Sequence, residues 1–175
     1  MGFDEFGAPE DRRDDWKTPE HLIAKIEGFF GGSIDLDPCA SGDPIDHFAT
    51  ENIYATSPAA ADGLGLDHPW NLDHVCAYVN PPYSDMMRWA KKCATEAREA
   101  VEGEIIMLAP ARTDTRWFTT CASSADAVCF YKGRIKFVGA TAGAKFPSVL
   151  LYWGHRKKHF MTAFSDVGIV MEFVR

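Results

Sequence analysis

The chain has 175 residues, enough for one domain with a sizeable core and too few for two full domains. Hydrophobic residues make up 46% and aromatic residues 13%, which excludes a disordered or fibrous protein, and no apolar run approaches the roughly 18 residues of a membrane span. The formal net charge of −7 argues against a broadly basic, nucleic-acid-coating surface.

Residues 1–15 differ in composition from the rest of the chain. They hold six acidic residues and two arginines, a net charge of −4, which leaves −3 for the other residues. We therefore expect a disordered acidic leader followed by one domain over 16–175. The amino terminus lacks the basic start and apolar run of a signal peptide. The five cysteines form no Cys-x-x-Cys pair, so we expect reduced thiols in a cytoplasm.

The first predicted helix follows Thr18 and Pro19, which have the residue types of an N-cap and a first helical position. Apolar residues then repeat at helical spacing as far as Gly31-Gly32, where the helix ends. The run 33–37 alternates like a strand, and we expect Pro38 to end it.

The remaining segments predict an alternation of strands and helices, which favours an α/β fold with a parallel-rich sheet. In chain order we expect a loop-rich region over 42–73 with a short strand at 52–54, a strand at 75–79, a helix over 85–101 capped by Ser84, a strand at 104–109, a short helix that begins at Thr113 or Asp114 and ends near 123, strands at 127–131, 134–138 and 148–153, a helix near 157–165 and a strand at 169–174.

The tetrapeptide Asn80-Pro81-Pro82-Tyr83 directly follows the buried strand predicted at 75–79. In open α/β sheets, ligands bind at the carboxyl ends of the strands. Two prolines fix the backbone there, an amide offers hydrogen-bond acceptors, and a tyrosine ring offers a stacking surface. This combination suits a planar group that carries an amine.

Three further motifs precede the tetrapeptide: Trp16-Lys17-Thr18-Pro19, then Asp35-Leu36-Asp37-Pro38-Cys39-Ala40-Ser41-Gly42, then Asp62-Gly63-Leu64. In this order they resemble the S-adenosylmethionine-dependent amino-methyltransferases of DNA, most closely the phage-type Dam family of DNA N6-adenine methyltransferases. The stretch 108–118, the element 133–137 and Phe146-Pro147-Ser148 are also similar to that family. The resemblance implies a compact Rossmann-like class I methyltransferase sheet, mostly parallel with an antiparallel C-terminal hairpin.

The resemblance also implies a site for S-adenosylmethionine, formed by Trp16, Thr18, Pro19, Asp35, Asp37, Pro38, Cys39, Ala40, Ser41 and Asp62. A helix start exposes backbone N–H groups that suit the methionine carboxylate. Asp35 or Asp37 suits the positively charged amino group, and Asp62 suits the adenine amine of the cofactor. The residue that binds the ribose hydroxyls is unassigned, with Glu51 as a weak candidate.

For the reaction we expect methyl transfer to the N6 of a DNA adenine. Asn80 and the Pro81 carbonyl would hold the amine, and Tyr83 would stack on a base flipped out of the duplex. No metal is expected. DNA contacts are expected from Arg112, Thr113, Thr115, Trp117, Arg134 and Phe137, with loops 42–73 and 112–145 recognising a short or relaxed target. Arg134 requires either a phosphate or a buried carboxylate as its partner.

Two alternatives stay open. The same tetrapeptide suits a methyltransferase acting on a protein glutamine or an RNA guanine, and the fold suits a non-catalytic module that binds DNA or a partner protein. The sequence indicates neither the target site nor the oligomeric state.

Overall fold

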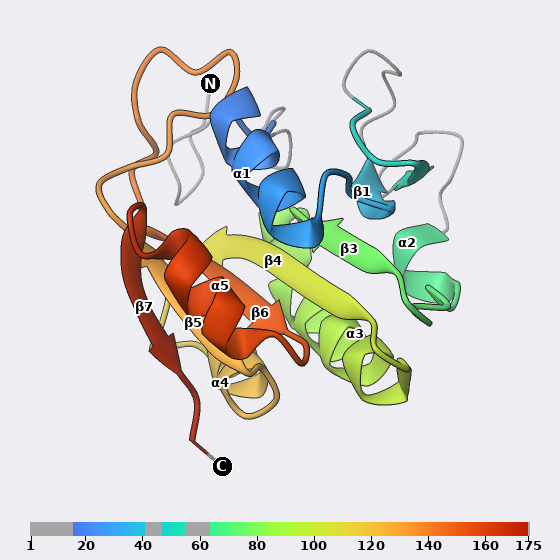
Figure 1. Ribbon diagram of the computed structural model, residues 1–175. Helices are drawn as coiled ribbons and strands as arrows, with labels where there is room; N and C mark the ends of the chain where they lie inside the picture. The colour runs from blue at the N-terminus through green and yellow to red at the C-terminus, as the bar shows by residue number, and fades with distance from the viewer. Residues whose placement is uncertain (1–15, 41–46, 55–63, 175) are drawn as a thin grey trace.

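The computed structural model describes residues 16–40, 47–54 and 64–174 (Figure 1). Its elements, in chain order, are α1 (Glu20–Phe30), β1 (Leu36–Ala40), β2 (Glu51–Tyr54), α2 (Leu64–Asp67), β3 (Cys76–Val79), the 3-10 turn η3 (Tyr83–Asp85), α3 (Met86–Glu99), β4 (Glu104–Pro110), α4 (Arg116–Ala122), β5 (Ala127–Tyr131), β6 (Ser148–Trp153), α5 (Lys157–Phe164) and β7 (Gly168–Glu172).

These strands form one seven-stranded sheet in the order β2-β1-β3-β4-β6-β5-β7. The pairs β1–β2, β1–β3 and β3–β4 are parallel, whereas β6 runs antiparallel to both β4 and β5, and β7 antiparallel to β5. The α/β class is confirmed. The prediction of a mostly parallel sheet is wrong, because helix–strand alternation does not encode the direction in which a later strand enters the sheet.

Helices cover both faces of the sheet. Figure 1 shows α1 and α5 on one face and α3 and α4 on the other. Apolar side chains from both helical layers meet the strands, including Ile26, Trp89, Phe160 and Phe164, all 1% exposed or less. No helix within the described residues combines the length and the apolar character that a membrane crossing requires.

The parallel half of the sheet contains a topological switch point. The chain passes from β1 to β2 on one side and then to β3 on the other side of β1. The chain therefore leaves β1 and β3 toward opposite sides of the sheet, and open α/β sheets bind ligands at the carboxyl ends of the strands where connections diverge in this way. The end of β3 leads directly into Asn80.

Several predicted boundaries are wrong for identifiable physical reasons. Strand β1 continues through Pro38, because its pairing with β2 shifts register between Asp37 and Ala40 and a bulge tolerates proline. Residues 134–138 form no strand. Their side chains alternate between buried and exposed without backbone pairing to the sheet. Helix α3 begins after η3 with Asp85 at its N-cap, not Ser84.

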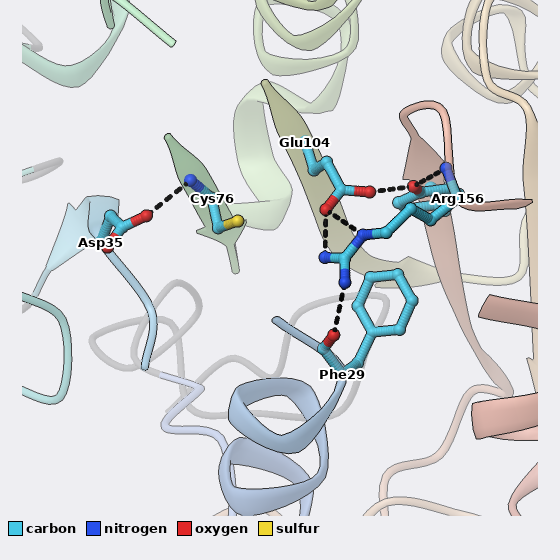
Figure 2. Close-up of polar contacts among 6 residues, drawn as sticks. Phe29, Asp35, Cys76, Glu104 and Arg156 are labelled. Atoms are coloured by element: carbon cyan, nitrogen blue, oxygen red, sulfur yellow. Dashed lines mark hydrogen bonds and ion pairs between the residues drawn. The ribbon is translucent and has the colours of Figure 1, made fainter. Parts of the chain in front are cut away.

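A buried polar network holds the amino-terminal edge of the sheet (Figure 2). Glu104, 2% exposed, accepts hydrogen bonds from the Tyr152 hydroxyl and from the Arg156 guanidinium, whose Nε lies 2.8 Å from Oε2. Arg156 also donates to the Phe29 carbonyl at 3.2 Å and lies over the Phe29 ring. The network ties the carboxyl end of α1 to β4 and α5.

Candidate active site

The side-chain amide of Asn80 has a fixed orientation. Its Nδ2 donates to the Trp16 carbonyl and to the Thr18 hydroxyl, the latter at 3.2 Å. A carbonyl oxygen only accepts hydrogen bonds, so the NH₂ group must face Trp16. The opposite atom, Oδ1, receives the Tyr83 hydroxyl at 3.3 Å and keeps a second lone pair for another donor.

The Thr18 hydroxyl connects this amide to the sheet. It lies 2.7 Å from the hydroxyl of Tyr78, a side chain on β3 that is fully buried. The prediction that Thr18 caps α1 is wrong, because Pro19 is the N-cap residue and no side chain caps the helix. The hydroxyl is bonded to Tyr78 and Asn80 instead.

Tyr78 is a site residue that the sequence analysis missed. A tyrosine inside an apolar strand needs a hydrogen-bond partner for its hydroxyl. Tyr78 and Asn80 are two positions apart, so an extended chain directs their side chains to the same side. That requirement is the signal that points to it. Burial raises the pKa of Tyr78 above its ordinary value, so the hydroxyl stays neutral and able to bond.

The two prolines of the tetrapeptide have different backbone environments. The Pro82 carbonyl accepts the Asp85 N–H at 3.2 Å, whereas within the described residues the Pro81 carbonyl accepts no hydrogen bond. An acceptor without a described partner thus directly follows Asn80 in the sequence, and its role in holding an amine stays a prediction.

Tyr83 is only 4% exposed, with its ring edge-on to Phe146 at 5.5 Å between centroids. Burial raises the pKa of its hydroxyl, which favours the neutral donor seen toward Asn80. Its stacking on a flipped base stays a prediction.

Asp37 is a buried carboxylate on β1, and it is hydrogen-bonded to Cys39, which contacts the Asn80 backbone. It is 5% exposed and accepts the Cys39 N–H at 2.8 Å. Desolvation raises its pKa to about 7, against smaller lowering effects from the Cys39 N–H and from His47. A bound cation would lower the pKa of this carboxyl and so favour its negatively charged form.

The last residues of β1 lie beside the tetrapeptide. Cys39 interacts with the backbone of Asn80, and its thiol has a raised pKa, mainly through burial. Helix α2 packs onto this strand so closely that a Cβ at Gly65 would lie 2.0 Å from the Pro38 carbonyl oxygen. Ala40 is the last residue of β1, whereas Ser41 and Asp62 lie outside the described residues.

Asp35 lies at the other end of the strands. Its carboxylate accepts the Cys76 N–H at 2.9 Å, at the amino end of β3 (Figure 2). Glu51 pairs with Leu36 at the same amino end. The structure therefore brings Asp37, and not Asp35, into the neighbourhood of Asn80.

Trp16 joins the site to an aromatic cluster. Its ring lies 5.1 Å from Phe137 and 5.9 Å from Phe146, and Phe137 is 2% exposed. The indole N–H of Trp16 is buried without a partner among the described residues. An unsatisfied buried donor is costly, and a bound ligand would satisfy it.

The expected DNA-contacting residues of 112–117 lie at the carboxyl end of β4. Thr115, and not Thr113 or Asp114, is the N-cap of α4, and its hydroxyl accepts the Phe118 N–H at 3.3 Å. Arg112, Thr113 and Trp117 are partly or fully exposed. Arg134 is exposed and has no buried carboxylate beside it in the described chain.

Comparisons with known proteins point in one direction. The family model for DNA N-6-adenine-methyltransferase (Dam) matches residues 7–165. A curated DNA N-6-adenine-methyltransferase of Escherichia phage T1 is 33% identical over 118 residues, which cover 67% of this chain and 44% of that protein. The chain thus spans less than half the length of this curated relative.

Proposed function

The chain belongs to the DNA N-6-adenine-methyltransferase (Dam) family, and from that premise we propose that it transfers a methyl group from S-adenosylmethionine to the exocyclic N6 of adenine in DNA. The observation that carries this proposal is the fixed amide of Asn80. An adenine amine is a poor nucleophile because its lone pair is delocalised into the ring, so it must be held in a changed geometry before it reacts.

The residues at the end of β3 suit that task. Asn80 Oδ1 and the Pro81 carbonyl each accept one amine hydrogen, which favours a tetrahedral nitrogen whose lone pair points away from both acceptors. The amide positions the amine without taking its proton, since an amide is not a base at neutral pH. The adenine would reach this pair only after leaving the duplex stack, where Tyr83 is the proposed stacking partner.

The neighbouring groups fit S-adenosylmethionine, which supplies an electrophilic methyl group when bound. Asp37 is a buried carboxylate suited to the cationic amino group. The Glu20 and His21 N–H groups at the start of α1 donate to no described residue and suit the methionine carboxylate. Trp16, Pro38, Cys39 and Ala40 would line the pocket, and Ser41 and Asp62 stay proposals outside the described residues.

We also propose that the sheet is of the Rossmann-like class I methyltransferase type. The switch point between β1 and β3 and the antiparallel insertion of β6 between β4 and β5 support this assignment. Among the described residues, the chain between β1 and β3 contains one strand, β2, which has four residues.

The direct test is incubation with methyl-labelled S-adenosylmethionine and, separately, DNA, RNA and protein. We expect label in DNA alone, recovered as N6-methyladenine. Asn80→Ala should abolish transfer while cofactor binding, measured by calorimetry, is retained. Label entering only protein or RNA would establish one of the rival substrates. Unchanged turnover in Asn80→Ala would refute the role given to the amide, and cofactor binding without transfer would favour a binding module.

The target sequence is proposed to be short or relaxed, recognised by loops within 42–73 and 112–145. Single-molecule sequencing of DNA treated with the enzyme shows the methylated motif directly. A long, strictly recognised site would contradict this proposal.

A further inference from the structure

The segment between β5 and β6 carries charge of a single sign. Residues 132–147, which we call the basic arm, contain four basic residues and no acidic residue, in a chain whose net charge is −7. The four basic side chains are all exposed: Lys132, Arg134, Lys136 and Lys145.

The basic arm is an ordered surface held by buried anchors. Ile135 and Phe137 are at most 2% exposed, and Ala144 and Phe146 are each 6% exposed. The Ala144 N–H donates to the Ile135 carbonyl at 2.8 Å, which ties the two halves of the arm together. Exposed cations and buried anchors therefore alternate along a fixed backbone.

The same anchors attach the arm to the candidate active site. Phe137 packs on Trp16, whose carbonyl receives the Asn80 amide, and Phe146 packs on Tyr83. The Val138 N–H also donates to the Lys17 carbonyl at 3.0 Å. Lys136 and Lys145 are the chain neighbours of Phe137 and Phe146, so these two cations lie at the rim of the site and the other two continue along the same arm.

These four cations are not neutralised by the described part of the protein. None of them forms an ion pair with a described residue. Some cations elsewhere do form ion pairs: Lys92 pairs with Glu96 at 2.5 Å, and Lys157 with Glu172 at 3.1 Å. The rim thus keeps a local positive potential on an otherwise acidic molecule.

We propose that the basic arm binds the phosphate backbone of the DNA strand on either side of the flipped base. The inference rests on the proposed function and adds to it the surface that positions the duplex. Phosphate contacts set register and orientation without reading sequence, and exposed lysines on an ordered loop suit that role. Because the net charge of the whole chain repels DNA, a basic rim beside Asn80 also favours one docking face.

The test replaces the four cations with glutamine: Lys132→Gln, Arg134→Gln, Lys136→Gln and Lys145→Gln in one protein. Binding of a fluorescein-labelled duplex is measured by anisotropy between 50 and 200 mM salt. We expect at least about a ten-fold loss of affinity at low salt, and a salt slope shallower by about 0.9 for each lost phosphate contact. Calorimetric affinity for S-adenosylmethionine should be unchanged.

The matched control makes the same change in net charge elsewhere: Lys91→Gln, Arg98→Gln, Lys157→Gln and Lys158→Gln. It should keep the slope and affinity of the unmodified protein. A second variant exchanges lysine and arginine within the arm, and should also keep the slope. Equal losses in the arm and control variants, or no loss in the arm variant, overturn the inference.

Failure of the inference can be told apart from failure of the proposed function. Normal adenine methylation with arm-independent DNA binding overturns the basic arm alone. Arm-dependent DNA binding without methyl transfer supports the arm and overturns the enzymatic proposal.

Discussion

At the scale of single residues, orientation matters more than identity for Asn80. An asparagine offers one acceptor and one donor end, and a rotated amide would present hydrogens to the incoming amine. The Trp16 carbonyl excludes that rotation, since it only accepts hydrogen bonds, and the Thr18 hydroxyl also receives Nδ2. The hydroxyl of Thr18 is itself held by Tyr78, 2.7 Å away on β3. Thr18 and Tyr78 are therefore positioning residues for the proposed reaction.

Replacing Thr18 with valine should lower kcat about ten-fold, because one hydrogen bond that orients Asn80 is lost and the Tyr78 hydroxyl is left buried without its partner. Single-turnover methylation measures the effect. Thr18→Ser keeps the hydroxyl and should recover most of the rate. If the valine variant instead raised only the Kd for the cofactor, Thr18 would be a cofactor ligand.

Asp37 gives a prediction about pH. Its pKa is about 7 in the folded protein against 3.8 ordinarily, so the folded state holds the proton more tightly. Stability from this group is fully present below about pH 4 and is lost as the pH rises to about 7. Asp37→Asn removes the free-energy cost of burying a charged carboxylate. It should stabilise the protein at pH 8 by up to about 4 kcal/mol, while weakening cofactor binding.

Denaturant unfolding at pH 8 and at pH 5 measures this difference, which should shrink at the lower pH as wild-type Asp37 takes up its proton. The control, Asp114→Asn, changes a carboxylate that is 77% exposed and should leave both curves unchanged. A stabilisation that does not vary with pH would be inconsistent with a buried, charged Asp37.

At the scale of elements, α2 contacts the end of β1 that is proposed to bind the cofactor. A Cβ on Gly65 would meet the Pro38 carbonyl oxygen at 2.0 Å and the Trp89 ring at 2.9 Å. The Gly65 carbonyl also accepts the Trp70 indole N–H at 2.7 Å, which limits how far α2 can move. Only glycine permits this approach.

Gly65→Ala should therefore cost about 1–3 kcal/mol of stability, as overpacking does, and should weaken cofactor binding by displacing Pro38. Gly28→Ala is the matched control, because a Cβ there meets nothing within 4 Å inside α1. It should stabilise the protein by about 0.5–1 kcal/mol. Thermal unfolding and calorimetry compare the two; equal behaviour would contradict the close contact.

The elements that were predictable from sequence are those with strong local signals. Helix α1 has apolar residues at helical spacing and ends at Gly31, and β4 is an unbroken apolar run. Residues 134–138 have strand-like alternation, yet their alternate burial comes from packing on Trp16, a contact between distant segments. The partners of Asn80 were missed for the same reason, since Thr18 lies 62 positions away in sequence. Local patterns located the site but not the bonds that orient it.

At the scale of the whole molecule, α1 connects the carboxyl ends of the central strands with their amino ends. Its start adjoins Thr18 and the Asn80 amide, and the Phe29 carbonyl near its end receives Arg156 from the Glu104 network (Figure 2). The helix has 11 residues and spans about 16 Å. Its inner face, including Leu22 and Ile26, is buried against the sheet along this length. Anchoring by apolar packing should therefore keep α1 in place when one polar end contact is lost.

Arg156→Met tests whether the Glu104 network contributes to stability without affecting the rate of methyl transfer. The buried Glu104 carboxylate would lose its cation while staying buried, which should cost about 3 kcal/mol in unfolding free energy. Adding Glu104→Gln should recover part of the loss, because the buried charge disappears. At 20 °C, where the variant stays folded, kcat should change less than about two-fold, within about 0.4 kcal/mol of the barrier. Thr18→Val should instead slow the reaction about ten-fold, and it should also cost about 1–3 kcal/mol of stability because the buried Tyr78 hydroxyl loses its partner. A large fall in kcat for Arg156→Met at 20 °C would instead mean that the Glu104 network sets the position of Thr18 through α1.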